Sequence, residues 1–226
     1  MTTQPLSLAI IMDGNRRYAK EHGIPMLEGH RLGYKKLKSV VEWAKHNQVK
    51  YLTVYAFSTE NWNRTEEEVE LLMTLFAEAI KEVLLEAKTS GVRIMFLGER
   101  GALSPTLKEL MAYAESETRD VNGITLGIAL SYGGRSEIIS AIRRIPRESL
   151  ADLSESMFSS YLFTKEVPDP DLIIRTGGEH RLSNFLPWQS VYSELYFVDT
   201  LWPDFSHKEF DAALTWYRER DRRRGM

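Results

Sequence analysis

The side chains best suited to chemistry lie in residues 12–18, MDGNRRY, which place one carboxylate, one glycine and two guanidinium groups together. Residues 8–12 are apolar and typical of a buried strand, and good helix formers follow from Ala19. The polar residues are therefore predicted where a strand turns into a helix. Backbone N–H groups converge at such a junction and the helix dipole favours negative charge, so this segment is suited to bind an anion.

The side chains of this segment indicate which kind of anion the segment is suited to bind. Asp13 is placed to hold a hard divalent cation, and Gly14 lets the backbone approach a ligand closely. Arg17 and Arg16 present planar guanidinium groups that match phosphate oxygens. We interpret the segment as a diphosphate site with Mg²⁺. The structural alternative is a helix N-terminus with a capping aspartate and surface arginines, which a short motif alone leaves open.

Two further segments have a similar composition. Residues 175–184, RTGGEHRLSN, again combine glycines, arginines and a hydroxyl after an apolar run, which predicts a second phosphate cradle containing Arg175, Arg181, Leu182 and Ser183. The alternative is an ordinary turn with a surface ion pair between Arg175 and Glu179. Residues 57–64 form a third polar loop. Its candidate side chains are those of Ser58, Thr59, Glu60, Asn61, Trp62 and Arg64.

Glu194 stands directly before the apolar residues 195–197. A carboxylate that enters an apolar strand needs a partner, such as a metal ion or an arginine. His180 is a further candidate for the metal, although a lone histidine more often only satisfies a hydrogen bond.

Apolar runs alternate with helical patterns along the chain. We expect strands at 8–12, 51–57, 92–97, 124–132, 171–176 and 194–199, and helices near 29–48, 66–89, 105–118, 135–145, 155–163 and 206–223. Such alternation predicts an α/β fold, a single domain over 1–226 with a largely parallel central sheet flanked by helices. Ligands of these sheets bind beyond the carboxyl ends of the strands, so the polar segments converge on one rim.

Composition narrows the class of protein. A chain of 226 residues with 43% hydrophobic residues and a net charge of −3 suits one globular domain and lacks the electrostatic footprint of a nucleic-acid-binding protein. The absence of cysteine excludes disulfides and suits a reducing compartment. The first apolar run is too short to span a bilayer, so we expect a cytoplasmic protein.

The predicted helix at 66–89 carries two apolar strips. One strip contains Leu72 and Ile80, and the other adds Leu71, Leu75 and Leu85. Burial against the sheet accounts for one strip, and the other is available to line a tunnel for a hydrocarbon ligand or to form a subunit interface. Two phosphate cradles beside surplus apolar surface indicate two lipid diphosphates that meet head to tail.

These motifs, in this order, resemble the cis-prenyltransferases, the undecaprenyl diphosphate synthase family, over essentially the whole chain. The matching segments are Met12-Asp13-Gly14-Asn15 with Arg17, Gly29-His30, Tyr55 to Trp62 with Arg64, Tyr132-Gly133-Gly134-Arg135, and Asp171 to Phe205. The resemblance implies a magnesium-dependent condensation of isopentenyl diphosphate with an allylic prenyl diphosphate. The product would be a cis-polyprenyl diphosphate, the precursor of a glycosyl carrier lipid.

The resemblance also implies roles for individual residues. Asp13 would position Mg²⁺ and Asn61 would act at the reacting carbons, while Arg175, Arg181 and Ser183 would hold isopentenyl diphosphate. Glu194 would contribute to magnesium binding, partly from the side of a neighbouring subunit. The allylic diphosphate would be surrounded by Gly14, Asn15, Arg16, Arg17 and His30.

Two positions depart from the family pattern. Tyr18 stands where bacterial members usually have tryptophan, and Met26 stands where the family commonly has an arginine that contacts a diphosphate. This departure leaves three alternatives open: a polyprenyl synthase, a short-chain or non-head-to-tail synthase, or one subunit of a heteromeric enzyme. Arg223 to Gly225 resemble a C-terminal element that reaches across a dimer, which favours a homodimer. Peripheral contact with a membrane would allow the product to leave.

Overall fold

The computed structural model describes residues 6–220, without the side chain of residue 88. Its six strands form one sheet in the order β3-β4-β2-β1-β5-β6, and every neighbouring pair is parallel. The expected largely parallel sheet is therefore confirmed. The strands are β1 (Ser7–Ile11), β2 (Tyr51–Ser58), β3 (Val92–Leu97), β4 (Ile124–Tyr132), β5 (Leu172–Arg175) and β6 (Glu194–Phe197).

The helices connect these strands and agree closely with the sequence pattern. They are α1 (Asn15–Glu21), α2 (Met26–His46), α3 (Glu66–Ser90), α4 (Pro105–Thr118), α5 (Gly134–Arg144), α6 (Glu155–Ser159) and α7 (His207–Glu219). Three short 3₁₀ segments are η1 (Thr59–Asn63), η2 (Arg147–Ser149) and η3 (Trp202–Asp204). The expected helix near 29–48 begins earlier, at Met26, directly after Pro25, which makes no side-chain capping hydrogen bond.

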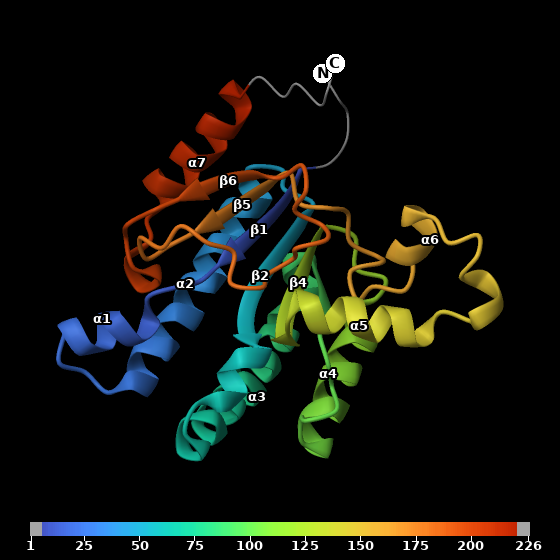
Figure 1. Cartoon of the computed structure of the whole chain (residues 1–226). Coiled ribbons are helices and arrows are strands. Elements are labelled where there is room, and N and C mark those ends of the chain that lie inside the picture. The colour runs from blue at the N-terminus through green and yellow to red at the C-terminus, as the bar shows by residue number, and fades with distance from the viewer. Residues whose placement is uncertain (1–5, 221–226) are drawn as a thin grey trace.

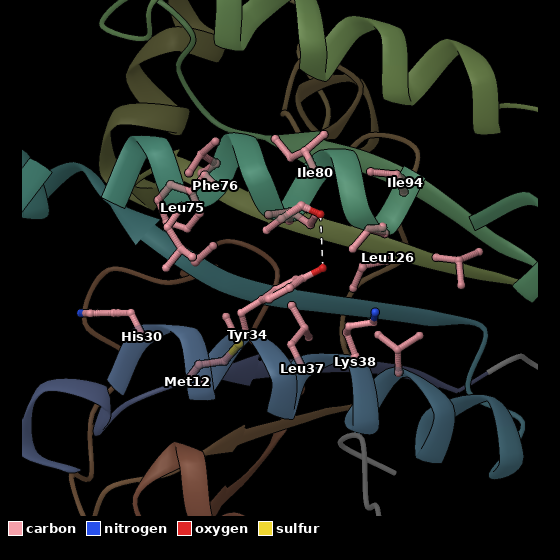
Figure 2. A pocket seen from close by; sticks show the side chains of 18 of the residues that line it. Met12, His30, Tyr34, Leu37, Lys38, Leu75, Phe76, Ile80, Ile94 and Leu126 are labelled. Atoms are coloured by element: carbon pink, nitrogen blue, oxygen red, sulfur yellow. Dashed lines mark hydrogen bonds between the residues drawn. The ribbon is translucent and has the colours of Figure 1, made fainter. Parts of the chain in front are cut away.

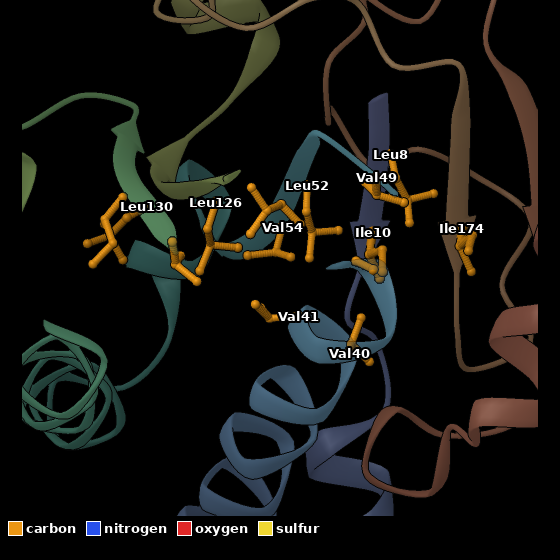
Figure 3. Packing of buried hydrophobic residues seen from close by; sticks show 14 of the residues in the cluster. Leu8, Ile10, Val40, Val41, Val49, Leu52, Val54, Leu126, Leu130 and Ile174 are labelled. Carbon is orange, nitrogen blue, oxygen red and sulfur yellow. The ribbon is translucent and has the colours of Figure 1, made fainter. Parts of the chain in front are cut away.

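Alternation along each strand separates the two faces of the sheet. Leu8 and Ile10 of β1 belong to the large core cluster, whereas Ala9 and Ile11 belong to a second cluster on the other face. All four residues are buried, since helices or irregular segments cover both faces. Figure 3 shows Leu8 and Ile10 together with side chains of β2, β4 and β5 and with Val40 of α2.

The two layers over the sheet differ in character. Residues of α2, α3, α4 and α7 pack into the large cluster with one face of the sheet. The other face is covered by α5, α6 and the irregular chain that follows them. Figure 1 shows α5 as the yellow helix that begins at the end of β4, and α7 as the red helix beside β6. Among the helices of residues 6–220, none has an apolar stretch long enough to cross a membrane.

Candidate active site

Asp13 lies just beyond the carboxyl end of β1, and its main chain is fixed on both sides. Its N–H is 3.0 Å from the carbonyl oxygen of Ile11 and 3.1 Å from the hydroxyl oxygen of Thr176. The carbonyl oxygen of Asp13 accepts hydrogen bonds from the Thr176 hydroxyl at 2.8 Å and from the N–H of Trp202 at 3.0 Å. Three separate segments therefore hold the position of this residue.

The carboxylate of Asp13 lies between two guanidinium groups. Arg175 Nη2 donates to Oδ2 at 2.8 Å, and Arg17 Nη2 is 3.3 Å from Oδ1. The side chain of Arg175 is 4% exposed, whereas that of Asp13 is 30% exposed. Part of the carboxylate therefore stays open to solvent while a buried arginine fixes its orientation.

Two glycines allow this close approach of segments. Gly14 has φ 120°, and a Cβ there would lie 2.9 Å from Leu201. Gly177 has φ 86°, and a Cβ there would lie 2.4 Å from Arg17 Nη2. Side-chain-bearing residues rarely adopt these φ values, so glycine is required at both positions.

Arg175 also connects Asp13 to the second predicted cradle. Its Nη1 donates to the carbonyl oxygen of Arg181 and, at 2.8 Å, to the hydroxyl of Ser183. Its Nε is buried without a hydrogen-bond partner. The guanidinium of Arg181 is largely exposed and pairs with Glu179, and Leu182 packs against the second apolar cluster. The structure thus brings both arginine-rich segments to the same rim of the sheet.

The third polar loop, residues 58–64, is held by its own hydrogen bonds. Ser58 ends β2 and caps η1, and its N–H donates to Oδ1 of Asn61 at 3.1 Å. Trp62 Nε1 donates to the Ser131 hydroxyl at 2.9 Å. Arg64 donates to Glu68 of α3 at 2.9 Å. Thr59 lies 3.3 Å from Glu60, within reach of a weak hydrogen bond.

These three segments line one polar cavity of about 580 Å³. Two of its polar atoms, Oδ1 of Asn15 and Nε2 of His30, are buried without a hydrogen-bond partner. Burial, together with the charges of Arg64 and Arg16, lowers the pKa of His30 from 6.5 to about 4. At neutral pH the imidazole is uncharged, and its unpaired nitrogen is available to a ligand. The residues that line the cavity include Asp13, Asn15, His30, Ser58, Glu60, Asn61, Arg64, Arg175, Ser183 and Asn184.

An apolar cavity adjoins the polar one. It lies between α2 and α3 above the sheet, encloses about 210 Å³, and shares Met12, Asn15, His30 and Leu72 with the polar cavity. The second apolar strip of α3 is only partly used by this cavity. Leu75 lines the cavity, whereas Leu71 and Leu85 are exposed. The expected surplus apolar surface is thus used in part as a cavity wall.

Tyr34 crosses this apolar cavity. Figure 2 shows its ring reaching from α2 toward α3, between His30 on one side and Lys38 on the other. Its hydroxyl lies 3.3 Å from the carbonyl oxygen of Ala79, within donor distance. Burial, together with a hydrogen bond to Glu82, raises the pKa of Tyr34 above its usual range. The sequence singled out no role for Tyr34, because a tyrosine on an amphipathic helix has no local signature.

The two departures from the family pattern have clear positions. Met26 is the first residue of α2 and is absent from the lining of the polar cavity. Arg16 Nη1 lies 3.6 Å from Glu68, the residue that also pairs with Arg64, so Arg16 stands beside the cavity. Arg31 instead lies 4.0 Å from Glu78 of α3. Either Arg16 or Arg31 could supply the diphosphate contact that Met26 lacks, and Arg16 is the one that lies beside the cavity.

Tyr18, at the other departure, stacks on His22 with ring centroids 4.0 Å apart. Tyr18 lies on α1, and His22 is the C-cap residue of that helix. The aromatic face is thus retained at this position, as the sequence suggested.

Comparisons with known proteins decide the family. The sequence model of a family described as "Putative undecaprenyl diphosphate synthase" matches residues 11–225. The chain belongs to the undecaprenyl diphosphate synthase family of prenyltransferases. An isoprenyl transferase of Clostridium perfringens is 46% identical over 98% of this chain and 90% of that protein. A farnesyl-diphosphate-specific ditrans,polycis-undecaprenyl-diphosphate synthase of Acinetobacter baylyi is 45% identical over 98% of this chain and 91% of that protein.

A solved structure of the same family gives a close structural match. Lavandulyl diphosphate synthase from Lavandula x intermedia, in complex with dimethylallyl diphosphate, superimposes with a TM-score of 0.92 at 35% identity. The match covers 96% of this chain and 97% of that one. The fold expected from the resemblance is therefore confirmed.

Glu194 does not join Asp13 within this prenyltransferase chain. It pairs in register with Leu172, which pairs with Leu8, so it lies at the amino end of the strands and away from the rim that carries Asp13. Its carboxylate is 3.2 Å from Nε of Arg220. Glu194 thus pairs with an arginine, one of the two kinds of partner, metal ion or arginine, that we expected from the sequence. A magnesium role for Glu194 from a neighbouring subunit stays a prediction.

The remaining sequence-based expectations have mixed outcomes. His180 stacks on Phe197 with ring centroids 4.8 Å apart. Arg223 to Gly225 lie outside the residues that the structure describes. Thr176 and Asn184 make several of the hydrogen bonds at the site, although the sequence assigned them no role. The residue type of Asn184 could have drawn attention to this position. Asparagine tolerates the left-handed backbone conformation, which Asn184 adopts here at φ 66°.

Proposed function

We propose that this prenyltransferase condenses isopentenyl diphosphate with an allylic prenyl diphosphate and releases a cis-polyprenyl diphosphate, the precursor of a glycosyl carrier lipid. One observation carries the proposal: the polar cavity beside Asp13 opens onto an apolar cavity between α2 and α3. An allylic prenyl diphosphate has the same division into a charged head and a hydrocarbon tail. The farnesyl-diphosphate specificity of the Acinetobacter baylyi relative supports the same substrate class.

The allylic diphosphate would lie against the start of α1. Gly14, Asn15, Arg16 and Arg17 come from that junction, and His30 faces it from α2. Arg17 and Arg16 supply charge, and the unpaired Nε2 of neutral His30 can donate a hydrogen bond to a phosphate oxygen. The tail would then extend past Met12 and Leu72 into the apolar cavity.

Isopentenyl diphosphate would bind to what we call the isopentenyl cradle, formed by Arg175, Arg181 and Ser183. Arg175 is already oriented by its bonds to Asp13 and Ser183. Arg181 is exposed and pairs only with Glu179 among its ion-pair partners within residues 6–220, so it can turn toward an incoming diphosphate. Leu182 lies between two of these residues and anchors the segment to the apolar cluster.

Mg²⁺ fits this site as a metal that arrives with the substrate. Among the described residues, no group of three histidine, aspartate or glutamate side chains could form a complete metal cage. Mg²⁺ commonly uses one or two protein carboxylates together with substrate phosphates and water. The half-open carboxylate of Asp13 meets that requirement. When bound, Mg²⁺ would neutralise the charge that gathers on the departing diphosphate.

In the reaction, the C–O bond between the allylic carbon and its diphosphate breaks while a C–C bond to isopentenyl diphosphate forms. One proton then leaves the isopentenyl carbon chain. Arg17, Arg16 and His30 would stabilise the departing diphosphate more strongly than the bound substrate, which is what accelerates the step. Asn61 is held by the N–H of Ser58. Because an amide is a poor base, we assign Asn61 to positioning and the proton to an oxygen of the released diphosphate.

A short-chain synthase is the second candidate, and the size of the apolar cavity favours it. A cavity of about 150 Å³ in another protein holds one benzene molecule, so 210 Å³ corresponds to roughly eight carbon atoms. That is fewer than two isoprene units, and Tyr34 stands in the way of more. The matching lavandulyl diphosphate synthase structure holds dimethylallyl diphosphate, which supports a short allylic substrate for this candidate.

We further propose a homodimer that forms along β6. This strand is an edge of the sheet, and the exposed side chains of Val191, Tyr192 and Leu195 lie on it or just before it. Exposed apolar groups beside an unpaired edge are typical of an interface. A dimer could bring Glu194 of one chain toward the site of the other, and a heteromeric partner would use the same surface. We also propose that the protein is cytoplasmic and contacts a membrane when it releases its product.

Product analysis tests the function directly. The enzyme is incubated with Mg²⁺, radiolabelled isopentenyl diphosphate and dimethylallyl, geranyl or farnesyl diphosphate in separate reactions. We expect labelled cis-prenyl diphosphates, with chain length and primer preference separating the long-chain from the short-chain candidate. Products in which label is joined by a non-head-to-tail bond would identify a non-head-to-tail synthase. If no primer supports incorporation by a folded dimer, either alone or with a candidate partner subunit, the proposed function is wrong.

A further inference from the structure

We propose that Asn184 is a positioning residue that couples the isopentenyl cradle to the loop 58–64, so that binding of one diphosphate orders the site of the other. The proposal rests on the proposed function, because it assumes that both segments hold substrates. Asn184 itself touches neither reacting carbon. It would act through the residues it holds in place.

Asn184 joins three segments that are far apart in the sequence. Its Nδ2 donates to Oε1 of Glu60 at 2.8 Å, and its Oδ1 accepts from the N–H of Arg135 at 2.9 Å. Its carbonyl oxygen accepts from the N–H of Gly134 at 2.8 Å. One residue thus connects η1, the start of α5 and the cradle segment through two side-chain hydrogen bonds and one main-chain hydrogen bond.

The connection continues into the cradle through the preceding residue. The hydroxyl of Ser183 accepts from Nη1 of Arg175 at 2.8 Å, and Nη2 of the same guanidinium pairs with Asp13. The carbonyl oxygen of Ser183 lies 3.3 Å from the Tyr55 hydroxyl. A diphosphate that binds Arg175 and Ser183 would therefore act directly on the peptide that carries Asn184.

The connection continues into the loop 58–64 through Glu60. Burial by itself raises the pKa of Glu60, but hydrogen bonds from Asn184, its own N–H, Ser58 and Thr59 outweigh burial and hold it below its usual range. Glu60 is therefore ionised, and its bond with Asn184 is charge-assisted. Glu60 lies in η1 between Ser58 and Asn61, so holding its carboxylate fixes the turn that presents both residues.

The backbone of this connection is held in an unusual conformation. Ser183 has φ 49° and Asn184 has φ 66°, in the left-handed region that few side-chain-bearing residues adopt. The contact is also tightly packed, because a Cβ on Gly133 would lie 2.3 Å from the Thr59 hydroxyl and 2.8 Å from Nδ2 of Asn184. Such a turn persists only while its partners hold it, and a change at one partner is passed to the others.

An exchange of donor and acceptor tests the coupling. Asn184→Asp keeps the size of the side chain, its tolerance of the left-handed backbone and the acceptor for Arg135, but it places a carboxylate against Glu60. We expect the KM for isopentenyl diphosphate to rise about tenfold or more and kcat to fall. Adding Glu60→Gln supplies an amide donor to the new carboxylate. The double variant should return to within about threefold of the Glu60→Gln single variant.

A binding measurement separates coupling from a general loss of structure. Isopentenyl diphosphate is titrated with and without an allylic thiolodiphosphate, in which sulfur replaces the bridging oxygen and slows ionisation. In the natural protein each ligand should tighten the other by the same factor. That factor should fall to one in Asn184→Asp and return in the double variant. Asn184→Gly, which retains the backbone conformation, should lose the coupling without being rescued by Glu60→Gln.

The results distinguish this inference from the proposed function. If the natural protein turns over both substrates and the double variant is no better than Asn184→Asp, the coupling role is wrong and the function stands. The same conclusion follows if the two ligands bind the natural protein independently. If the natural protein binds neither diphosphate, the proposed function fails first, and the inference fails with it. Should Asn184→Asp not fold, the comparison of Asn184→Gly with the natural protein in the titration decides the matter.

Discussion

The carboxylate of Asp13 accepts a 2.8 Å hydrogen bond from the guanidinium of Arg175, and the two residues lie at the carboxyl ends of neighbouring parallel strands. Ile11 and Arg175 are register partners in β1 and β5, so the sheet itself sets this pair. Arg175 is buried while Asp13 is partly open. The arginine therefore orients the carboxylate, and its second Nη connects the pair to Ser183 in the isopentenyl cradle.

This pair determines which variant of Asp13 is informative. Asp13→Asn removes the charge that Mg²⁺ needs but keeps an oxygen that accepts from Arg175. We expect its turnover to fall by several powers of ten, about 4 kcal/mol or more of transition-state stabilisation, with little change in folding. Single-turnover rates at saturating Mg²⁺ and primer measure the effect. Near-normal rates would rule out the assigned role.

Asp13→Ala should lose activity as well, but with an added loss of stability. It leaves the buried guanidinium of Arg175 without its carboxylate partner. Breaking a buried ion pair in this way destabilises proteins by about 3–5 kcal/mol, and the partial exposure of Asp13 makes the lower end the better expectation. Urea denaturation of the two variants compares them. Equal stability of Asp13→Asn and Asp13→Ala would show that the hydrogen bond kept by asparagine contributes little to folding.

Restoring an arginine at position 26 should improve binding of a long allylic diphosphate. Met26 begins α2, three residues before Gly29, whose backbone packs against Asn15 in the junction that we assign to that diphosphate. A charge-assisted hydrogen bond of good geometry contributes roughly 1.5–3 kcal/mol, so Met26→Arg should lower the apparent KM for the primer about tenfold or more. Met26→Gln is the matched control of similar length without charge. An unchanged or higher KM in Met26→Arg would show that Arg16 already fills this role.

Removing the ring of Tyr34 should lengthen the product. Tyr34→Ala opens the apolar cavity beyond its present barrier, whereas Tyr34→Phe keeps the ring but loses the contact with the carbonyl of Ala79. We expect the longest products from Tyr34→Ala and an intermediate distribution from Tyr34→Phe, as measured by chromatography of labelled products. A chain-length distribution that neither variant alters would place the limit on chain length elsewhere.

His30 should make the stability of the fold depend on pH. Its pKa is about 4 in the folded protein, mainly through burial, and 6.5 in an unfolded chain. Below pH 6.5 the unfolded state binds more protons, so the free energy of unfolding falls by up to about 3 kcal/mol as pH drops from 6.5 toward 4. Above pH 6.5 the ring is neutral in both states, and this loss of unfolding free energy is absent.

Urea denaturation between pH 4 and pH 7 measures this dependence. His30→Gln, which keeps a polar side chain without a titrating group, should flatten the curve over that range. An NMR titration of the imidazole supplies an independent check. An imidazole that titrates near pH 6.5 in the folded protein would contradict the expected burial effect.

Complementation between inactive variants tests whether sites are completed across a dimer. A chain truncated after Arg222 lacks Arg223 and Gly225, and we expect it to lose most activity while remaining dimeric. Mixing it with full-length Asp13→Ala chains should restore part of the activity. A mixed dimer then contains one site with an intact Asp13 and a C-terminus donated by the other chain. Full activity of the truncated chain, or an active monomer in light scattering, would exclude completion in trans.

The sequence by itself determined the class of fold and the identity of the polar segments. The continuous apolar run of β1 and the long apolar stripe of α3 are local patterns, and they indicate a strand buried on both faces and a helix buried along one face. Asp13, Ser58 and Arg175 each end or follow an apolar run, so their arrival at one rim followed from the parallel sheet. The family resemblance rested on the same short segments.

Only the tertiary structure decided which of these residues meet. Asp13 and Arg175 are 162 positions apart and Glu60 and Asn184 are 124 apart, so no local pattern reports their contact. Glu194 stands before its strand whereas Asp13 follows β1, and the parallel pairing of β6 with β5 therefore carries Glu194 to the opposite end of the sheet. Tyr34 became a barrier only because α3 packs across from α2. Contacts of this kind depend on register and helix packing, which follow from burial summed over the whole chain.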